Sequence, residues 1–248
     1  MRGSASFPIR LRYDRRGKIR WISHRDTARA FERAFRVESL PLAFSEGFSP
    51  RPRVSFGPAL PTGAESDAEY LDVDLAAEVD LDALPGRLSE ALPDGMSVTG
   101  AAALAERAPA LMDAVTLTVW RVEVERLDGG PIDPGDATAW CDAALAAPVL
   151  LTARRRRGQE VDDDVRPLLR RLAVAGLEPG VWLDLELDTH PRSAKPAEVV
   201  AAVAACCGMP GGLLERRAVR IHQFIERDGA RLEPLSADTL TRAEARAS

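Results

Sequence analysis

The sequence predicts an α+β fold built from two similar halves, each with an antiparallel sheet. The order strand, helix, strand, helix, strand occurs twice along the 248 residues when an opening hairpin counts as one unit. Residues 182–187 repeat the pattern aromatic, Leu, acid, aliphatic, acid, Leu of residues 70–75, at a separation of 112 residues. The same separation carries the first strand and first helix of one half onto their counterparts in the other. This order approximates the split βαβ of ferredoxin-like domains, so we expect tandem duplicated ferredoxin-like halves.

A β-hairpin is expected to open the first half. Residues 7–13 alternate apolar side chains with arginines, which is the period of a half-buried strand. Residues 14–17 supply a turn, and residues 18–22 resume the alternation with Trp21 on the inner side. The basic side chains of both strands would then share the opposite face of the hairpin: Arg10, Arg12, Lys18 and Arg20.

A helix and a long loop should follow the hairpin. Ser23 followed by Asp26 resembles a capping box, in which the hydroxyl accepts a hydrogen bond from a free helix amide. Three arginines at four-residue steps predict one basic stripe on that helix: Arg25, Arg29 and Arg33. Residues 44–66 hold four prolines and three glycines, which predicts a loop with one short strand at residues 54–56. Loops of this length in compact domains are usually functional or disordered.

The remaining elements follow from the same periodicities. Strands are predicted at residues 70–75, 96–104, 116–125, 182–187 and 219–225, and helices at residues 82–92, 137–146 and 196–206. The predicted domains are an N-terminal half at residues 1–108, a C-terminal half at residues 109–233 and a polar tail at residues 234–248.

Composition excludes several classes of protein. No apolar run reaches the roughly 18 residues of a membrane span, and the N-terminus lacks the apolar stretch of a signal peptide, so we expect a cytoplasmic protein. The three cysteines, Cys141, Cys206 and Cys207, form neither paired zinc spacings nor an iron–sulfur pattern. We therefore expect no metal and no cofactor, and any radical or redox chemistry would belong to a partner.

Charge is unevenly distributed along the chain. Residues 1–53 carry thirteen Lys and Arg against five Asp and Glu, a net charge of +8, and the remainder carries −13. Such asymmetry favours an anionic partner for the basic end, most often nucleic acid, although a solvated basic surface is equally compatible with it.

The long loop contains the side chains that bind RNA in many proteins. Hydroxyls, arginines and backbone amides contact phosphates, and aromatic rings stack on unpaired bases. The loop supplies all of these: Ser45, Gly47, Phe48, Ser49, Arg51 and Arg53. A proline-stiffened structural loop is the alternative, and the loop lacks the lysine and spacing of a P-loop.

Two further candidates also have structural alternatives. His24, beside Ser23 and Arg25, could act as a general acid or base at a helix N-terminus, or could be a first-turn surface residue. The basic hairpin face could bind RNA, or Asp72 and Asp74 on a neighbouring strand could neutralise it.

Two sequence blocks carry a resemblance to a known family. The two blocks are residues 17–26, GKIRWISHRD, and residues 43–56, AFSEGFSPRPRVSF. The resemblance extends to residues 60–63 and 69–72. The chain resembles the radical-SAM-linked proteins, a domain of unknown function found beside or fused to cobalamin-binding-type radical SAM proteins. The family usually has Leu or Asn where this chain has Arg25 and Ser49. The resemblance implies an accessory protein with a radical SAM protein as partner, makes an RNA substrate plausible, and supplies no catalytic residue.

The sequence thus predicts an RNA-recognising accessory protein of a radical SAM enzyme, without catalysis of its own. The binding surface would comprise the basic hairpin, the first helix through Arg29 and the loop up to Arg53. Two alternatives stay open: a metal-independent endoribonuclease-like enzyme using His24, and a scaffold that recognises only the radical SAM protein.

Overall fold

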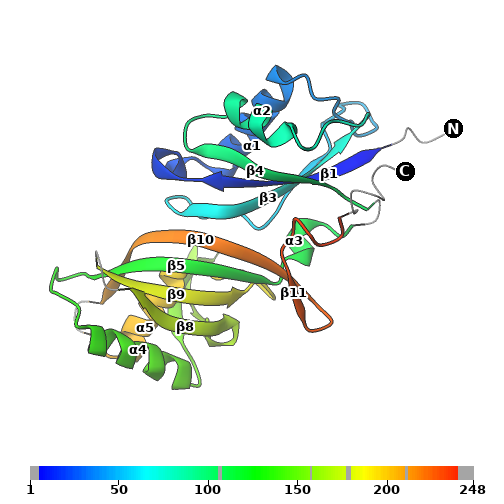
Figure 1. The fold of residues 1–248 in the computed structure, drawn as a ribbon. Coiled ribbons are helices and arrows are strands. Elements are labelled where there is room, and N and C mark those ends of the chain that lie inside the picture. Colours follow the sequence, from blue (N-terminus) through cyan, green and yellow to red (C-terminus); the bar gives the residue numbers. More distant parts are fainter. Residues whose placement is uncertain (1–5, 106–107, 157, 177–179, 210–211, 240–248) are drawn as a thin grey trace. The chain divides into compact units, whose positions relative to one another are not determined.

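The computed structural model describes residues 6–105, 108–156, 158–176, 180–209 and 212–239 (Figure 1). It is a mixed α/β fold with mostly antiparallel sheet and, within these residues, five α-helices. The chain forms two compact units, of which unit 1 comprises Met1–Val115 and Gln223–Ser248 and unit 2 comprises Thr116–His222. The boundaries of the two units differ from those of the predicted domains. Residues 223–239 belong to unit 1, together with the N-terminal part of the chain.

Unit 1 contains part of a sheet in which β4, β1, β3 and β2 are antiparallel neighbours in that order. Its elements in chain order are β1 (Phe7–Arg15), the 3₁₀ helix η1 (Gly17–Trp21), α1 (His24–Val37), β2 (Val54–Phe56), β3 (Glu65–Leu75), α2 (Leu84–Ala91), β4 (Met96–Ala103), α3 (Leu111–Ala114), the end of β10 (Leu213–Arg227) and β11 (Ala230–Leu232). Helices α1 and α2 lie over one face of this sheet (Figure 1).

The main core of unit 1 lies between that face and the two helices. Alternation places Leu11 of β1 and Leu71 of β3 inward, and both side chains are fully buried. From α1, Phe31 and Phe35 pack on them, four residues apart on one face of the helix. This packing fixes the position of α1, which carries His24, Arg25 and Arg29 of the predicted site.

The predicted hairpin is wrong in its second strand. Residues 17–21 form η1 instead, after Gly17 adopts a positive φ of 71°. Strand β1 pairs with β3 on one edge and with β4 on the other, so neither edge is left for a hairpin partner. A five-residue alternation was too short to distinguish a strand from a 3₁₀ turn.

The described part of the predicted polar tail is packed on unit 1. Ala237 is buried in a second cluster with Tyr70 of β3 and Leu111 of α3. The tail continues the fold through an isolated bridge between Leu104 and Thr239. Residues 240–248 of the predicted tail lie outside the described residues.

Unit 2 has a sheet in the order β10-β5-β9-β8, to which β10 contributes its part before residue 223. Its other elements are β5 (Leu117–Arg126), α4 (Pro134–Ala146), β6 (Leu151–Arg156), β7 (Gln159–Asp164), the 3₁₀ helix η2 (Arg166–Leu168), β8 (Leu169–Gly176), β9 (Val181–Asp188) and α5 (Pro196–Cys206). Strands β6 and β7 form a separate two-stranded sheet. The strict alternation of burial along β9 matches the predicted strand at residues 182–187.

Within the described residues, no helix is long and apolar enough to span a membrane. Within the same residues, no group of three or more His, Cys, Asp or Glu side chains is placed to hold a metal ion.

Candidate functional site

The N-terminus of α1 is capped as the sequence predicts. Ser23 Oγ accepts a hydrogen bond from the Asp26 amide at 3.2 Å and donates to Asp26 Oδ2 at 2.6 Å. The bond from Ser23 lowers the pKa of Asp26 below its ordinary value, with a smaller contribution from Arg29. Ser23 therefore has a structural role, and His24 is the first residue of the helix.

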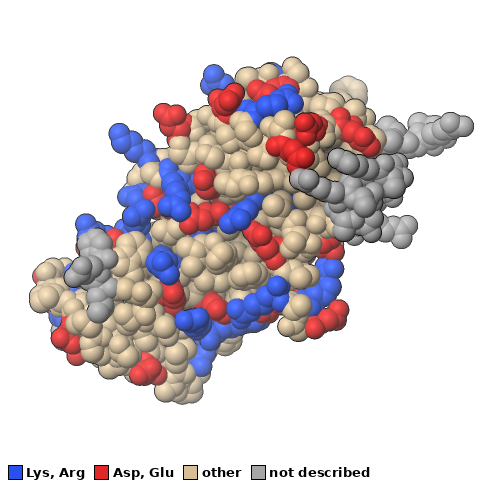
Figure 2. Space-filling view, viewed as in Figure 1, with Lys and Arg blue, Asp and Glu red and all other residues tan. Residues whose placement is uncertain are grey.

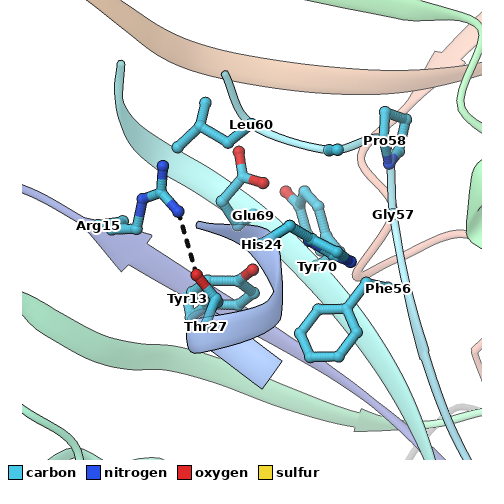
Figure 3. A pocket seen from close by; sticks show the side chains of 11 residues that line it. Tyr13, Arg15, His24, Thr27, Phe56, Gly57, Pro58, Leu60, Glu69 and Tyr70 are labelled. Carbon is cyan, nitrogen blue, oxygen red and sulfur yellow. Dashed lines mark hydrogen bonds between the residues drawn. The ribbon is translucent and has the colours of Figure 1, made fainter. Parts of the chain in front are cut away.

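A small pocket of about 10 Å³ lies beside His24, with room for roughly one water molecule. Its lining side chains come from β1, α1, β3 and the segment after β2 (Figure 3). The His24 ring meets Phe56 edge to face, with ring centres 5.1 Å apart, which holds the imidazole at this position.

The pocket wall contains buried polar side chains. Arg15 is almost fully buried, and it donates to Thr27 Oγ1 at 3.1 Å and to the Pro61 carbonyl at 3.5 Å. Glu69 is also buried and lines the same hollow (Figure 3). The hydroxyl of Tyr70 donates to Glu233 at 2.8 Å; burial, together with that bond, raises the pKa of Tyr70 far above its ordinary value.

The solvent face of α1 presents basic side chains. Arg25, Arg29 and Arg33 are exposed, as is Arg36 near the end of the helix. Among the residues that the structure describes, the one ion pair to this row is the weak, exposed pair between Arg29 and Asp26 at 3.2 Å. The predicted basic stripe of α1 is thus open to solvent.

The loop before β2 is closed at its base by backbone pairing. Phe44 and Pro52 form an isolated bridge, the Ser45 amide donates to the Arg51 carbonyl at 2.8 Å, and the Arg51 amide donates to Ser45 Oγ at 3.1 Å. Ser45 therefore holds the loop closed, and the tip between these residues, with Phe48, is fully exposed. The exposed residues of this loop are Phe44, Glu46, Gly47, Phe48, Ser49, Pro50, Arg51 and Arg53.

The predicted basic face of the hairpin does not form. Arg10 is completely buried against Asp72, with Nε–Oδ1 and Nη2–Oδ2 distances of 2.6 and 2.8 Å. Arg12 pairs with Glu233 at 3.0 Å. Arg20 lies on η1, 3.8 Å from Glu65, and only Lys18 of the four is exposed. The cause is the missing second strand, together with the acidic partners on β3 and the C-terminal segment.

The charge pattern of the surface agrees with this pairing. Figure 2 shows basic and acidic side chains interspersed over the face drawn. Much of the excess of +8 in residues 1–53 is thereby neutralised locally, and the exposed remainder lies on α1, the loop and Lys18.

A family model matches residues 8–197, most of the chain. Its description is "Uncharacterized protein conserved in bacteria (DUF2344)". The chain belongs to this family. Among curated proteins, a search finds no match.

One similar solved structure is "Crystal Structure of a Cbf5-Nop10-Gar1 Complex". The TM-score is 0.51 at 7% sequence identity, and the match covers 90% of this chain. The chain spans 50% of the length of the chain it matches. This likeness concerns the fold alone.

Sequence reasoning missed the members of this DUF2344 protein's pocket other than His24. The sequence pattern places Arg15 in a predicted turn and Glu69 beside a predicted strand. No short sequence motif indicates that these two residues line the same pocket. Trp21, predicted inward, is 63% exposed. The one usable signal was the position of Glu69 in residues 69–72, which continue the family resemblance beyond its two main blocks.

Proposed function

We propose that this protein is an accessory RNA-recognising protein of the cytoplasm, whose binding surface is the solvent face of α1 together with the loop at residues 44–53. The observation that carries the proposal is the contrast between two sets of basic residues. Those of the sheet are paired internally, whereas Arg25, Arg29 and Arg33 of α1 are exposed. Exposed guanidinium groups in a row are suited to successive phosphates of a polynucleotide.

The loop adds a second kind of contact to the phosphate contacts. Arg51 is exposed close to the closed base of the loop, and Arg53 makes only a long contact of 3.5 Å with Asp74. Phe48 projects at the tip. Basic and aromatic side chains on one short loop favour a polynucleotide over a small anion, because a small anion needs no stacking surface.

Salt-dependent RNA affinity tests this proposal. Replacing Arg25, Arg29 and Arg33 together by Gln should weaken binding and reduce the slope of log affinity against log salt by about one per lost phosphate contact. The matched control replaces Arg87, Arg121 and Arg231 together by Gln, because these three arginines are exposed but paired with Glu38, Asp184 and Glu226. Equal affinity and slope in the two variants would overturn the proposal.

The partner proposed from family resemblance is a radical SAM protein. The support for this partnership is the resemblance of residues 17–26 and 43–56 to the radical-SAM-linked proteins. Co-purification of the two proteins, with and without nuclease treatment, checks this partnership. Loss of the complex on nuclease treatment would favour RNA as the bridge, and a complex without any RNA affinity would favour the protein-only scaffold.

We further propose that both units are split βαβ domains of the ferredoxin type and are copies of one ancestor. Each unit supports this with the strand order 4-1-3-2, counted within the unit after leaving out the separate hairpin β6-β7, and with one helix after the first and one after the third of these strands. The first helix residue of α2, Leu84, lies 112 residues before the start of α5.

A second candidate function is metal-independent RNA cleavage, favoured by one observation. His24 lines a pocket together with the buried side chains of Arg15 and Glu69, and convergent ionisable groups at a hollow are characteristic of active sites. Incubation of structured RNAs with wild type and His24→Ala in chelator tests it. The variant should lose the products of the wild type, and identical products from both would exclude His24 catalysis.

A further inference from the structure

We infer that the RNA recognised by this protein is unpaired, and that Trp21 is a platform on which one of its bases stacks. The inference rests on the proposed function and extends it to a substrate class. It assigns a binding role to Trp21, an uncharged residue outside the row of arginines on α1.

The exposed aromatic rings of the protein are concentrated in one segment. Among the described residues, the large aromatic side chains that are exposed are Trp21, Phe44 and Phe48. All three lie within residues 1–53, where the basic side chains are also concentrated. Trp120, in unit 2, is buried as an ordinary core residue would be. Exposing a large aromatic ring to water is unfavourable. Because the exposed rings lie in the same segment as the basic side chains, they indicate a ligand with both flat apolar groups and negative charge.

The Trp21 ring is held in place even though it is exposed. A Cβ atom added to Gly63 would lie 2.9 Å from Trp21 Cζ3, so the glycine backbone packs directly against the ring. The Gly63 amide donates to the Arg20 carbonyl at 2.8 Å, which ties the two segments together. Gly63 has a φ of +92°, a conformation that favours glycine. A fixed ring loses little conformational freedom when a base stacks on it.

Cationic groups flank the platform. Lys18 lies three residues before Trp21 in η1, and side chains at this spacing eclipse in a 3₁₀ helix. Lys18 is exposed, so an ammonium group and an indole ring share one face of η1. The Arg20 guanidinium lies over one face of the indole, 5.1 Å from the ring centre, so a base would stack on the ring surface that Arg20 leaves exposed. A nucleotide with its base on Trp21 could place its phosphate near Lys18.

Stacking on a protein ring requires an accessible base face. In an A-form RNA duplex the faces of each base are covered by the neighbouring bases. The major groove of such a duplex is too deep and narrow for side chains to reach the base edges. Only unpaired nucleotides can therefore use Trp21 and Phe48, whereas the arginines of α1 can contact the phosphates of either form. The Trp21 platform therefore predicts a preference for unpaired over duplex RNA, which the arginines of α1 alone would not give.

Fluorescence and affinity measurements on the full chain test this inference. The probes are a short uridine oligonucleotide, a short adenosine oligonucleotide and a duplex RNA of the same charge. We expect single strands to bind the wild type more tightly than the duplex and to quench tryptophan emission. Trp21→Leu should bind single strands about ten-fold more weakly and lose the quenching, with duplex affinity unchanged. Trp21→Phe keeps a ring and should retain most of the single-strand affinity.

Controls separate this inference from the proposed function. Leu214→Ala removes an exposed apolar side chain of unit 2 and should change the affinity for none of the three probes. If the wild type binds no RNA, the proposed function fails and the inference with it. If RNA binds but Trp21→Leu affects neither affinity nor quenching, the inference alone fails. Loss of radical SAM co-purification by Trp21→Leu, with single-strand affinity intact, would also overturn it and assign the ring to a protein interface.

Discussion

Arg10 illustrates how a residue with the sequence pattern of a surface cation becomes part of the core. Besides its bonds to Asp72, Nη1 donates to the Pro234 carbonyl at 2.9 Å and to the Ala237 carbonyl at 3.4 Å. Pro234 lies 224 residues after Arg10 in sequence. Alternation therefore assigned Arg10 to the correct face of β1, but it contained no information about the segment that covers that face.

Replacing Arg10 by Met should lower the free energy of unfolding by about 3–5 kcal/mol, because the carboxylate of Asp72 would lose its partner in a largely buried place. Urea denaturation followed by circular dichroism measures the loss. The double variant Arg10→Met, Asp72→Leu removes both charges and should recover much of the stability. Equal losses in the single and double variants would contradict the assigned coupling of the pair.

The same pair predicts a pH dependence. Burial raises the pKa of Asp72 above its ordinary value, and the bonds from Arg10 offset only part of this. The folded state then binds more protons than the unfolded state between the two pKa values, so the contribution of Asp72 to stability grows as pH falls through that window. In Arg10→Met the offset is removed, and the gain in unfolding free energy on acidification should exceed that of wild type in the same urea titrations.

At the scale of elements, regular periodicity was predictable and edge pairing was not. The cap at Ser23 and the alternation along β3 and β9 predicted α1 and both strands close to their observed positions. Residues 18–22 satisfied the same alternation but form most of η1, since β1 already has partners on both edges. Local sequence patterns thus predict whether a long element is a helix or a strand. The conformation of a short segment is decided by its tertiary pairing.

The candidate site divides along the same line. Its exposed part, the arginines of α1 and the loop tip at Phe48, could be predicted because helix periodicity and loop composition are local properties. Its buried part could not, since Arg15 and Glu69 come from different strands that the topology brings to one hollow. Trp21 was assigned to the wrong side because its exposure depends on the 3₁₀ turn.

At the scale of the whole molecule, unit 2 occupies one continuous stretch of sequence, whereas unit 1 is assembled from two separated stretches. The second stretch completes unit 1: it contributes Ile225 and Ala237 to a core cluster with Tyr70, and Gln223 donates to the Ala68 carbonyl at 2.6 Å. The basic surface of unit 1 thus depends on residues from the far end of the chain.

A chain ending at His222 should therefore lose stability in unit 1 while keeping unit 2 folded. Ile225 alone contributes roughly 1.5–3 kcal/mol through burial of its side chain. Hydrogen exchange measures the two units separately: amides of β1 and β3 should exchange faster in the truncated chain, and those of β5 and β9 should keep their protection. A chain ending at residue 239 retains every described contact of the C-terminal stretch and is the control. Unchanged protection of β1 after truncation at His222 would show that residues 223–239 are not needed for the stability of unit 1, whereas faster exchange confined to unit 1 would make them part of its fold.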